Sequence, residues 1–364
     1  MNPVSTPPTE AVAPRQAPRQ APRRPCDDDP IFIVGWGRTG TSLLRSMMNA
    51  HPRIYLTQEA NLYDWTVSRR LTSTRARLEA YFHSFSFAWL GIEHELVLDR
   101  FPGELKPEDF SPIYEFVLRT AAERHGCARF GDKNPTNQGH LERIFNDFEN
   151  PRVIRMMRDP RAVAVSHTRM PFSTPSLMLI NHIMRGTPEY MRPFEDKMHT
   201  VRLEDLIAKP RDTMERILDY IGEPWDDAVM DHVNHIPPHD GIPFPWLEPS
   251  GARPEPRPPS WPKALSPAWV RLIEKANRET MERFGYPIAE LGREPTSFEM
   301  SMAQLKELPL AVSFVTRAAC TLLRLAVPPW VPAERNQRML HTLNPRAWKR
   351  NPDWSLPVPP SVRP

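Results

Sequence analysis

The sequence predicts an α/β fold of three layers, in which helices cover both faces of a central parallel β-sheet. The first observation is an unbroken apolar run at residues 31–34, which ends at a glycine turn. Such a run is typical of a strand that is buried on both faces. The second observation is that strand-like segments alternate with helix-like segments along the chain. This alternation is typical of parallel sheets, because their strands are connected through helices.

Strands are predicted at 31–34, 128–131, 153–157 and 199–203. Helices are predicted at 41–49, 60–90, 112–125, 138–147, 160–168, 211–221 and 267–284. In the first of these helices the apolar residues share one face, as expected of a helix that packs on a sheet. Arg155 interrupts an otherwise apolar strand. A buried guanidinium requires a partner, and the sequence does not identify one.

Three regions are predicted along the chain. Residues 1–29 repeat an Ala-Pro-Arg unit and contain few apolar groups, so we expect a disordered tail. Residues 30–290 are expected to form the α/β domain. It includes a proline-rich ordered loop at 236–263, whose length is typical of a lid. Residues 291–364 are expected to be a helical and proline-rich C-terminal extension.

Within the extension, residues 308–328 are mostly apolar, with polar residues at helical spacing. The favoured interpretation is a helix that packs on the protein's own core or on a second subunit, so a homodimer is among the predicted partners. The alternative is an amphipathic helix that contacts a membrane surface, which would suit a lipid acceptor.

The charge balance argues against a nucleic-acid-binding domain. The 364 residues include 47 basic and 44 acidic side chains, for a formal net charge of +3. Nucleic-acid-binding domains are usually more basic, with the charges clustered. Three widely separated cysteines fit neither a disulfide framework nor a metal site. No apolar run reaches the ~18 residues of a membrane span, and no secretory signal is recognised, so a cytoplasmic location is expected.

The strongest local pattern is the loop Gly-Trp-Gly-Arg-Thr-Gly-Thr-Ser at 35–42, between the first strand and the first helix. Glycines let successive backbone N–H groups point at one anion, and the helix N-terminus adds about half a positive charge. Gly35 and Gly40 match the glycines of the loop that binds nucleoside triphosphates, but Thr41 stands where that loop has lysine. The cation is instead Arg38. The pattern predicts a phosphate site and argues against ATP or GTP hydrolysis.

A second anion site is predicted where the tetrapeptide Arg-Asp-Pro-Arg, at 158–161, follows a core strand. Pro160 suits the first turn of a helix, which places Ser166 about two turns along it. A guanidinium and a hydroxyl that meet in this way can hold a phosphate. The alternative is an ordinary helix start, in which Asp159 caps the helix and Arg158 forms a surface ion pair.

Together the two motifs resemble those of the sulfotransferases that use 3′-phosphoadenosine 5′-phosphosulfate (PAPS). Residues 37–44 resemble the 5′-phosphosulfate loop of that family, and 158–166 resemble its 3′-phosphate motif. Further blocks at 131–135 and 201–206 occur in family order, so the resemblance covers residues 30–287. It implies a P-loop-containing three-layer α/β/α fold of the sulfotransferase type, with the sulfotransferase domain at 30–290.

The match is closer to the bacterial and tyrosylprotein branch than to the cytosolic phenol branch, because Arg38 replaces the lysine of the cytosolic enzymes. In the tyrosylprotein enzymes the catalytic base is an acidic residue at the position of Glu59. The resemblance therefore implies that Glu59 is the base. The acidic residue that precedes the base in those enzymes is Gln58 here. The resemblance therefore does not identify the acceptor substrate of this protein.

The resemblance implies in-line transfer of the sulfuryl group from PAPS to a hydroxyl or amine, with PAP as the product and no metal required. Glu59 would act as general base, Arg38 and the loop N–H groups would stabilise the leaving phosphate, and Lys133 would contact the sulfuryl oxygens. The residues expected to bind the nucleotide are Gly37, Arg38, Thr39, Gly40, Thr41, Ser42, Arg158, Ser166 and Arg257.

Two other functions stay open at this point. A P-loop kinase-like enzyme would need the missing lysine and a Mg²⁺ site. A catalytically inactive nucleotide-binding module would need to have lost the base or one of the anion sites. The acceptor is open among small molecules, carbohydrates, lipids and peptide tyrosine.

Overall fold

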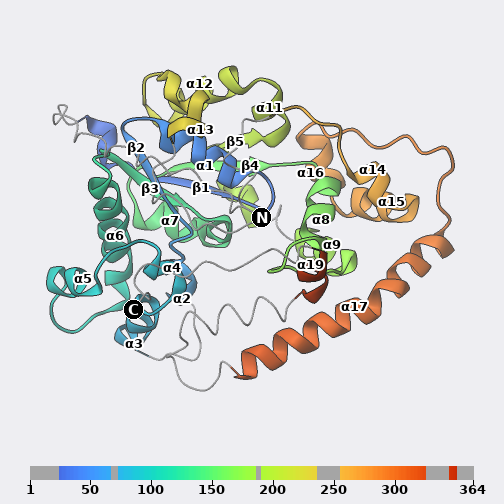
Figure 1. Ribbon diagram of the computed structural model, residues 1–364, viewed down its shortest axis with the longest axis horizontal. Helices are drawn as coiled ribbons and strands as arrows, with labels where there is room; N and C mark the ends of the chain where they lie inside the picture. The colour runs from blue at the N-terminus through green and yellow to red at the C-terminus, as the bar shows by residue number, and fades with distance from the viewer. Residues whose placement is uncertain (1–23, 67–72, 186–189, 236–254, 325–343, 351–364) are drawn as a thin grey trace, which may run out of the picture.

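The protein is described here from a computed structural model, which places residues 24–66, 73–185, 190–235, 255–324 and 344–350. Its centre is a five-stranded parallel sheet in the order β2-β3-β1-β4-β5 (Figure 1). The strands are β1 (Ile31–Gly35), β2 (Ile54–Gln58), β3 (Arg129–Lys133), β4 (Arg152–Met157) and β5 (Met198–Arg202). The predicted α/β class with a central parallel sheet is confirmed.

Helices connect the strands and extend beyond the sheet toward the C-terminus. They are α1 (Thr41–Ala50), α2 (Leu62–Thr66), α3 (Thr74–Phe82), α4 (Phe85–Ala88), α5 (His94–Arg100), α6 (Phe110–Arg124), α7 (Leu141–Asp147), α8 (Pro160–Thr168), α9 (Leu177–Arg185), α11 (Leu203–Ala208), α12 (Pro210–Ile221), α13 (His232–His235), α14 (Trp261–Ala264), α15 (Pro267–Ala276), α16 (Arg278–Arg283), α17 (Ser297–Arg324) and α19 (Pro345–Arg350). Most of the predicted helices are confirmed, but 60–90 is divided among three short ones.

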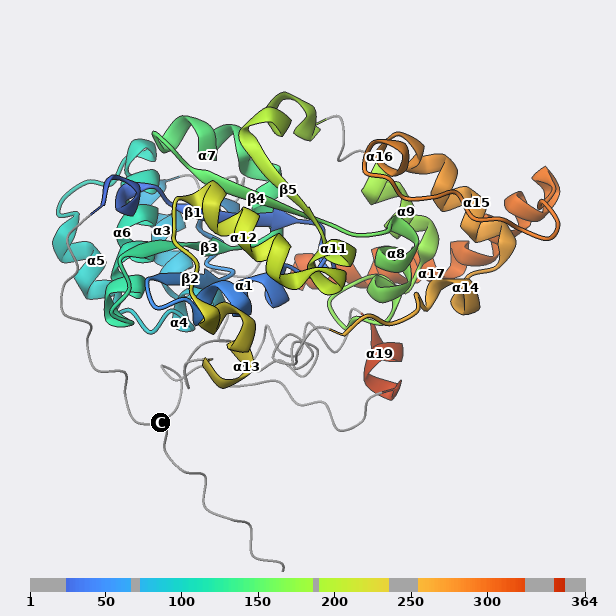
Figure 2. The ribbon, with the colours of Figure 1, turned by 90° about the horizontal axis from the view of Figure 1, so that it is seen from above.

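The three layers follow from the alternation of side chains along β1. Phe32 and Val34 belong to a core shared with α6 and α7, whereas Ile31 and Ile33 belong to a core shared with α1, α11 and α12. Side chains of a strand point to opposite faces in turn, so one apolar run supplies both cores. Figure 2 shows the sheet between these two groups of helices. A third core joins α8, α9 and α15.

Strand β2 is the one strand that the sequence does not predict. It lies at the edge of the sheet and pairs only with β3. Side chains of α1 satisfy backbone groups on its other side. Asn49 accepts from the Leu56 N–H at 2.8 Å, and its amide donates to the Leu56 carbonyl at 3.1 Å. Arg45 Nε also donates to that carbonyl, at 2.8 Å. Because side chains of α1 supply the hydrogen-bond partners of this strand, the residues of β2 themselves carry no pattern that predicts the strand.

Arg155, which lacked a partner in the sequence, has two in the structure. It forms an ion pair with Glu195 at 3.2 Å, and its guanidinium lies 5.1 Å from the centre of the Phe284 ring. Both partners follow β4 in the chain and return to it, so a charge in a buried strand is compensated by tertiary contacts. Of the proline-rich loop predicted at 236–263, residues 236–254 lie outside the described residues.

The predicted helix at 308–328 is confirmed as far as residue 324, where it forms the second half of α17. One face packs against α9 and α15; Glu307 on this face accepts a hydrogen bond from the Leu177 N–H, and Ala311 is buried. The opposite face exposes large apolar side chains: Phe298, Leu305, Leu308, Val312 and Val315. Figure 1 shows α17 at the periphery, away from the sheet. None of the helices that the structure describes is long and apolar enough to cross a membrane.

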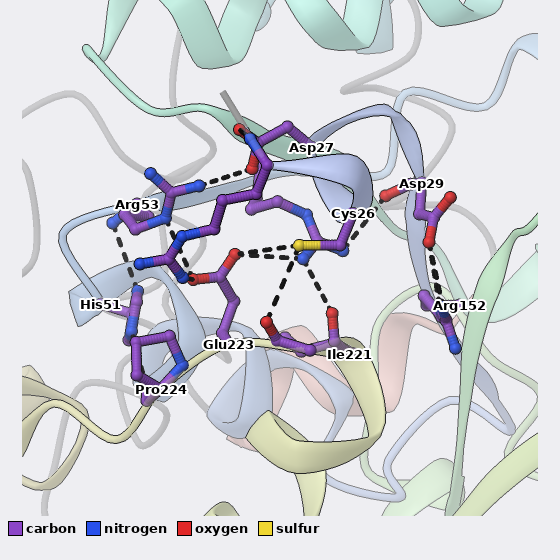
Figure 3. A network of polar contacts seen from close by, with 12 residues as sticks. Cys26, Asp27, Asp29, His51, Arg53, Arg152, Ile221, Glu223 and Pro224 are labelled. Atoms are coloured by element: carbon purple, nitrogen blue, oxygen red, sulfur yellow. Dashed lines mark hydrogen bonds and ion pairs between the residues drawn. The ribbon is translucent and has the colours of Figure 1, made fainter. Parts of the chain in front are cut away.

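The predicted disorder does not extend to residues 25–29. Residues 1–23 of the predicted tail lie outside the described residues, whereas residues 25–28 form a 3₁₀ turn at the amino edge of the sheet. Asp27 forms an ion pair with Arg53, and Asp29 forms one with Arg152 at 3.1 Å (Figure 3). These acidic residues follow the Pro/Arg repeats directly, and their pairing with arginines of the domain orders the segment.

Glu223 is the centre of this network. Its carboxylate accepts from Arg129 at 3.1 Å, with both side chains fully buried, and from Arg53 at 3.1 Å. Cys26, Asp27 and Glu223 lie close enough for their ligand atoms to share a metal ion. The arginines already compensate both carboxylates, however, so the charge balance favours a structural network over a metal site (Figure 3).

We expect the substitution Glu223→Gln to lower the free energy of unfolding by about 3 kcal/mol, because it leaves the buried Arg129 without a counter-charge. Urea denaturation monitored by circular dichroism measures the change. The control is Glu215→Gln, which breaks the exposed pair of Arg211 and Glu215 and should change stability by less than about 0.5 kcal/mol. Equal effects of the two substitutions would contradict the prediction.

Candidate active site

The loop between β1 and α1 has the shape expected of a phosphate-binding loop. Gly35 has φ 142°, and a Cβ there would lie 2.5 Å from the Met156 carbonyl oxygen. Gly40 has φ 91°, and a Cβ there would lie 2.5 Å from a methyl group of Leu203. Glycine is therefore required at both ends of the loop. Arg38 also has a left-handed backbone, with φ 71°, which is uncommon for a residue with a side chain.

The two predicted anion motifs meet because β1 and β4 are neighbours in the sheet. Arg38 Nε donates to the Ser166 hydroxyl at 3.1 Å, and Arg158 Nη1 donates to the Arg38 carbonyl at 3.0 Å. The chain leaves β1 toward β2 on one side of the sheet and leaves β4 toward β5 on the other. Ligands of α/β sheets bind at such a switch point, at the carboxyl ends of the strands.

The charges of Arg38 and Arg158 are not neutralised by ion pairs within the described residues. Burial, with the nearby Arg158 as a smaller cause, lowers the pKa of Arg38 to about 10. Burial also lowers the pKa of Arg158, although Glu204 and Asp159 oppose the effect. Two partly buried cations, each with a pKa lowered by burial, form a site that an anion would stabilise.

The other residues of the 158–161 motif hold the helix start. Asp159 accepts from the backbone N–H of Arg161 at 2.9 Å and so caps α8, as the ordinary interpretation of the motif expects. Arg161 forms ion pairs with Asp159 at 2.8 Å and with Glu274 at 2.6 Å. That interpretation is wrong for Arg158, which forms no ion pair among the described residues. The two arginines of the motif therefore differ: one is structural, and the other remains available to a ligand.

Glu59 and Lys133 lie at the ends of the adjacent strands β2 and β3. Lys133 Nζ is 2.6 Å from Glu59 Oε1; the lysine side chain is fully buried, and that of the glutamate is 40% exposed. Burial lowers the pKa of Lys133, and the Glu59 carboxylate opposes this effect. Lys133 pairs in register with Ile33, two residues before the loop begins. The sheet thus brings the predicted base and lysine together, beside the loop.

A buried network that the sequence did not reveal holds Glu59 in place. Glu59 has a left-handed backbone, with φ 56°, and its N–H donates to the Lys133 carbonyl at 2.9 Å. Asp132 accepts from the Ala60 N–H at 3.2 Å and from the Tyr114 hydroxyl at 2.7 Å. Burial raises the pKa of Asp132. The available signal was a charged residue in a buried strand, directly before Lys133.

A second residue that the sequence did not reveal is His167, which follows Ser166 in α8. Its Nε2 lies 2.9 Å from the Gly37 carbonyl oxygen, and its Nδ1 lies 3.0 Å from the Ser173 hydroxyl. Burial, assisted by the charge of Arg38, lowers the pKa of His167 to about 4. A lone histidine in a helix has no sequence signature of such a contact.

The remaining predicted residues occupy different places. Thr41 and Ser42 begin α1, where unpaired N–H groups are available to an anion. The Thr39 hydroxyl instead donates to the Trp36 carbonyl at 2.6 Å, so it ties the loop. Arg257 is 81% exposed and pairs with Glu255 at 3.5 Å, and nothing in the described structure connects it to the loop.

Comparison with known proteins identifies the family. A family model described as the sulfotransferase family matches residues 30–227, which is more than half of the chain. The chain belongs to the sulfotransferase family. The resemblance noted in the sequence is thereby confirmed, and the matched range includes the loop, the base position, Lys133 and the 158–166 motif of this sulfotransferase-family protein.

Two curated relatives are protein-tyrosine sulfotransferases. The one from Drosophila melanogaster is 29% identical over 230 residues, which cover 60% of this chain and 43% of the relative. Protein-tyrosine sulfotransferase 1 of Danio rerio is 25% identical over 222 residues, which cover 58% of each chain. The chain thus spans about half the length of these relatives. Among solved structures, the sulfotransferase domain from the curacin biosynthetic pathway has a TM-score of 0.48 at 18% identity, covering 72% of this chain and 99% of that domain.

The neutral, buried state of His167 predicts a pH dependence of stability. The unfolded chain binds a proton at this side chain below a pH of about 6.5, whereas the folded protein does so only near pH 4. The stability that neutral His167 contributes is therefore fully present above pH 6.5. It is lost as the pH falls toward 4, by at most about 1.4 kcal/mol per pH unit. The free energy of unfolding, measured by urea denaturation at pH 7 and at pH 5, should differ less between the two pH values for His167→Gln than for the wild type. An identical difference would contradict the prediction.

Proposed function

We propose that the protein transfers the sulfuryl group of PAPS to an acceptor hydroxyl or amine and releases PAP. The observation that carries this proposal is the meeting of Arg38, Arg158 and Ser166 at the carboxyl ends of β1 and β4, with two cations and no ion pair to a carboxylate among the described residues. A nucleotide with phosphates at both its 5′ and 3′ positions supplies anions for both motifs. Family membership supports the same ligand.

In this proposal the loop holds the 5′ end of the nucleotide. The N–H groups at the start of α1, with Thr41 and Ser42, bind the 5′-phosphate, and Arg38 stabilises the charge that develops on the leaving oxygen. Arg158 and Ser166 bind the 3′-phosphate. The lysine that a kinase would use is replaced by Thr41. The P-loop kinase alternative therefore has less support.

Glu59 is proposed as the general base. As the acceptor oxygen bonds to sulfur and the bond from sulfur to the bridging oxygen breaks, Glu59 takes the acceptor proton, and the electron pair leaves with PAP. One carboxylate oxygen contacts Lys133, while the other has no donor in the described structure, and the side chain is partly exposed. In this proposal Lys133 orients the base and contributes positive charge to the sulfuryl group.

For the acceptor we propose only a chemical class to test first. The names of the two curated relatives make a tyrosine phenol the first acceptor class to test, before carbohydrates, lipids and small molecules. A role for Arg257 over the nucleotide and a cytoplasmic location both stay predictions from the sequence.

The nucleotide proposal predicts that PAP raises the melting temperature and that ADP, which lacks the 3′-phosphate, raises it much less. At a concentration one hundred times its Kd, a ligand adds about 2.7 kcal/mol of stability. Differential scanning fluorimetry measures both shifts. Equal shifts from PAP and ADP, or none from either, would overturn the proposal.

The base proposal predicts that Glu59→Gln lowers turnover of PAPS with an accepted phenol by about 10²- to 10⁴-fold and leaves PAP affinity unchanged. Glutamine still accepts a hydrogen bond from Lys133 but is not basic, and because it also removes the counter-charge of buried Lys133, the melting temperature of the variant is measured alongside its turnover. The control is Glu79→Gln, an exposed glutamate paired with Arg75 on α3, which should retain full turnover. Normal turnover by Glu59→Gln would exclude Glu59 as the base.

A further inference from the structure

Three successive carbonyl groups of the phosphate loop accept hydrogen bonds from side chains. The Trp36 carbonyl accepts from the Thr39 hydroxyl at 2.6 Å. The Gly37 carbonyl accepts from His167 Nε2 at 2.9 Å, and the Arg38 carbonyl accepts from Arg158 Nη1 at 3.0 Å. A carbonyl directed at a bound anion would repel it, and each of these three carbonyl groups is instead held by a hydrogen-bond donor of the protein.

The planarity of the peptide makes the Gly37 contact the informative one. The C=O of one residue and the N–H of the next lie in one plane and point in opposite directions. A donor that holds the Gly37 carbonyl therefore directs the Arg38 N–H to the other side of the chain. No acceptor contacts the Arg38 N–H among the described residues, whereas the next N–H, that of Thr39, already donates to Trp36 at 3.3 Å.

The contacts of His167 determine its tautomer. A carbonyl oxygen can only accept, so Nε2 carries the proton and donates it to Gly37. Nδ1 is then an acceptor and receives the Ser173 hydroxyl at 3.0 Å. The Trp36 ring meets the imidazole edge-on, with centroids 6.4 Å apart. The two hydrogen bonds and the Trp36 contact together hold the imidazole ring in place.

The absence of a side chain at Gly37 lets this ring approach the loop closely. A Cβ at position 37 would lie 3.2 Å from His167 Cε1, closer than side chains normally pack. Ser166, the residue before His167, contacts the Arg38 side chain. Two successive residues of α8 therefore hold both the side chain and the main chain at the centre of the loop.

We propose that His167 is a positioning residue of the phosphate loop: its Nε2–H holds the Gly37 carbonyl outward and so aims the Arg38 N–H at the 5′-phosphosulfate group. This inference rests on the proposed function, because it assumes that the anion in the loop is the 5′ end of the nucleotide. It assigns His167 no contact with the nucleotide itself.

The test compares His167→Phe, which keeps an aromatic ring but removes the donor, with His167→Gln, which retains an N–H at the end of the side chain. Isothermal titration calorimetry gives the Kd of PAP and of adenosine 5′-monophosphate for each variant. His167→Phe should weaken both nucleotides by about five- to tenfold, because both place a phosphate in the loop, and His167→Gln should recover most of the loss.

The matched control is His51, a buried histidine whose Nε2 also contacts a backbone carbonyl, that of Pro224, at 3.1 Å. It lies in the network at the amino edge of the sheet (Figure 3). His51→Phe should lower the melting temperature and leave the Kd of PAP unchanged. A loss of PAP affinity in His51→Phe equal to that in His167→Phe would mean that general destabilisation explains both, and would overturn the inference.

Other outcomes are also decisive. Wild-type PAP affinity in His167→Phe, or an equal loss in the Phe and Gln variants, would overturn the role of the N–H donor while leaving the proposed function intact. Failure of the wild-type protein to bind either nucleotide would overturn the proposed function itself. If His167→Phe does not fold, His167→Leu, which also removes the donor, serves instead, and wild-type affinity for PAP in that variant would count against the inference.

Discussion

Arg38 and Arg158 bring two positive charges together at the carboxyl edge of the sheet, and no carboxylate in the described residues forms an ion pair with either. Like charges in a partly buried site repel each other, so this arrangement must be imposed by the surrounding structure. The imposing elements are the neighbouring strands β1 and β4, the glycines that let the loop turn, and the side-chain hydrogen bonds to its carbonyl groups. Much of the local structure serves to keep this uncompensated site in place.

Three other buried arginines in the described part of the chain have carboxylate partners. Arg155 has Glu195, Arg161 has Asp159 and Glu274, and Arg129 has Glu223. A sequence shows only that arginines occur near strand ends and does not show which of them have partners. The difference between the two arginines of the 158–161 motif appears only when the fold brings Glu274 to Arg161 and leaves Arg158 without an ion pair among the residues that the structure describes.

The sequence predicted most of what depends on local pattern. Apolar runs marked β1 and β4, and the glycine loop and the 158–166 motif named residues that the fold brings together, because each signal lies within a short stretch of chain. What depends on distant contacts was not predicted. Strand β2 is completed by side chains of α1, and the contact of His167 with Gly37 requires α8 to pack beside the loop. The order of residues 25–29 depends on arginines far along the chain.

The left-handed backbone of Glu59 has a consequence for how this protein could change under selection. A side chain in that conformation costs roughly 1 kcal/mol relative to glycine. Glycine or asparagine at this position would, however, leave the fully buried Lys133 without a counter-charge, which is the larger cost. Laboratory evolution for heat tolerance would therefore tend to retain a carboxylate at position 59, even without a screen for turnover.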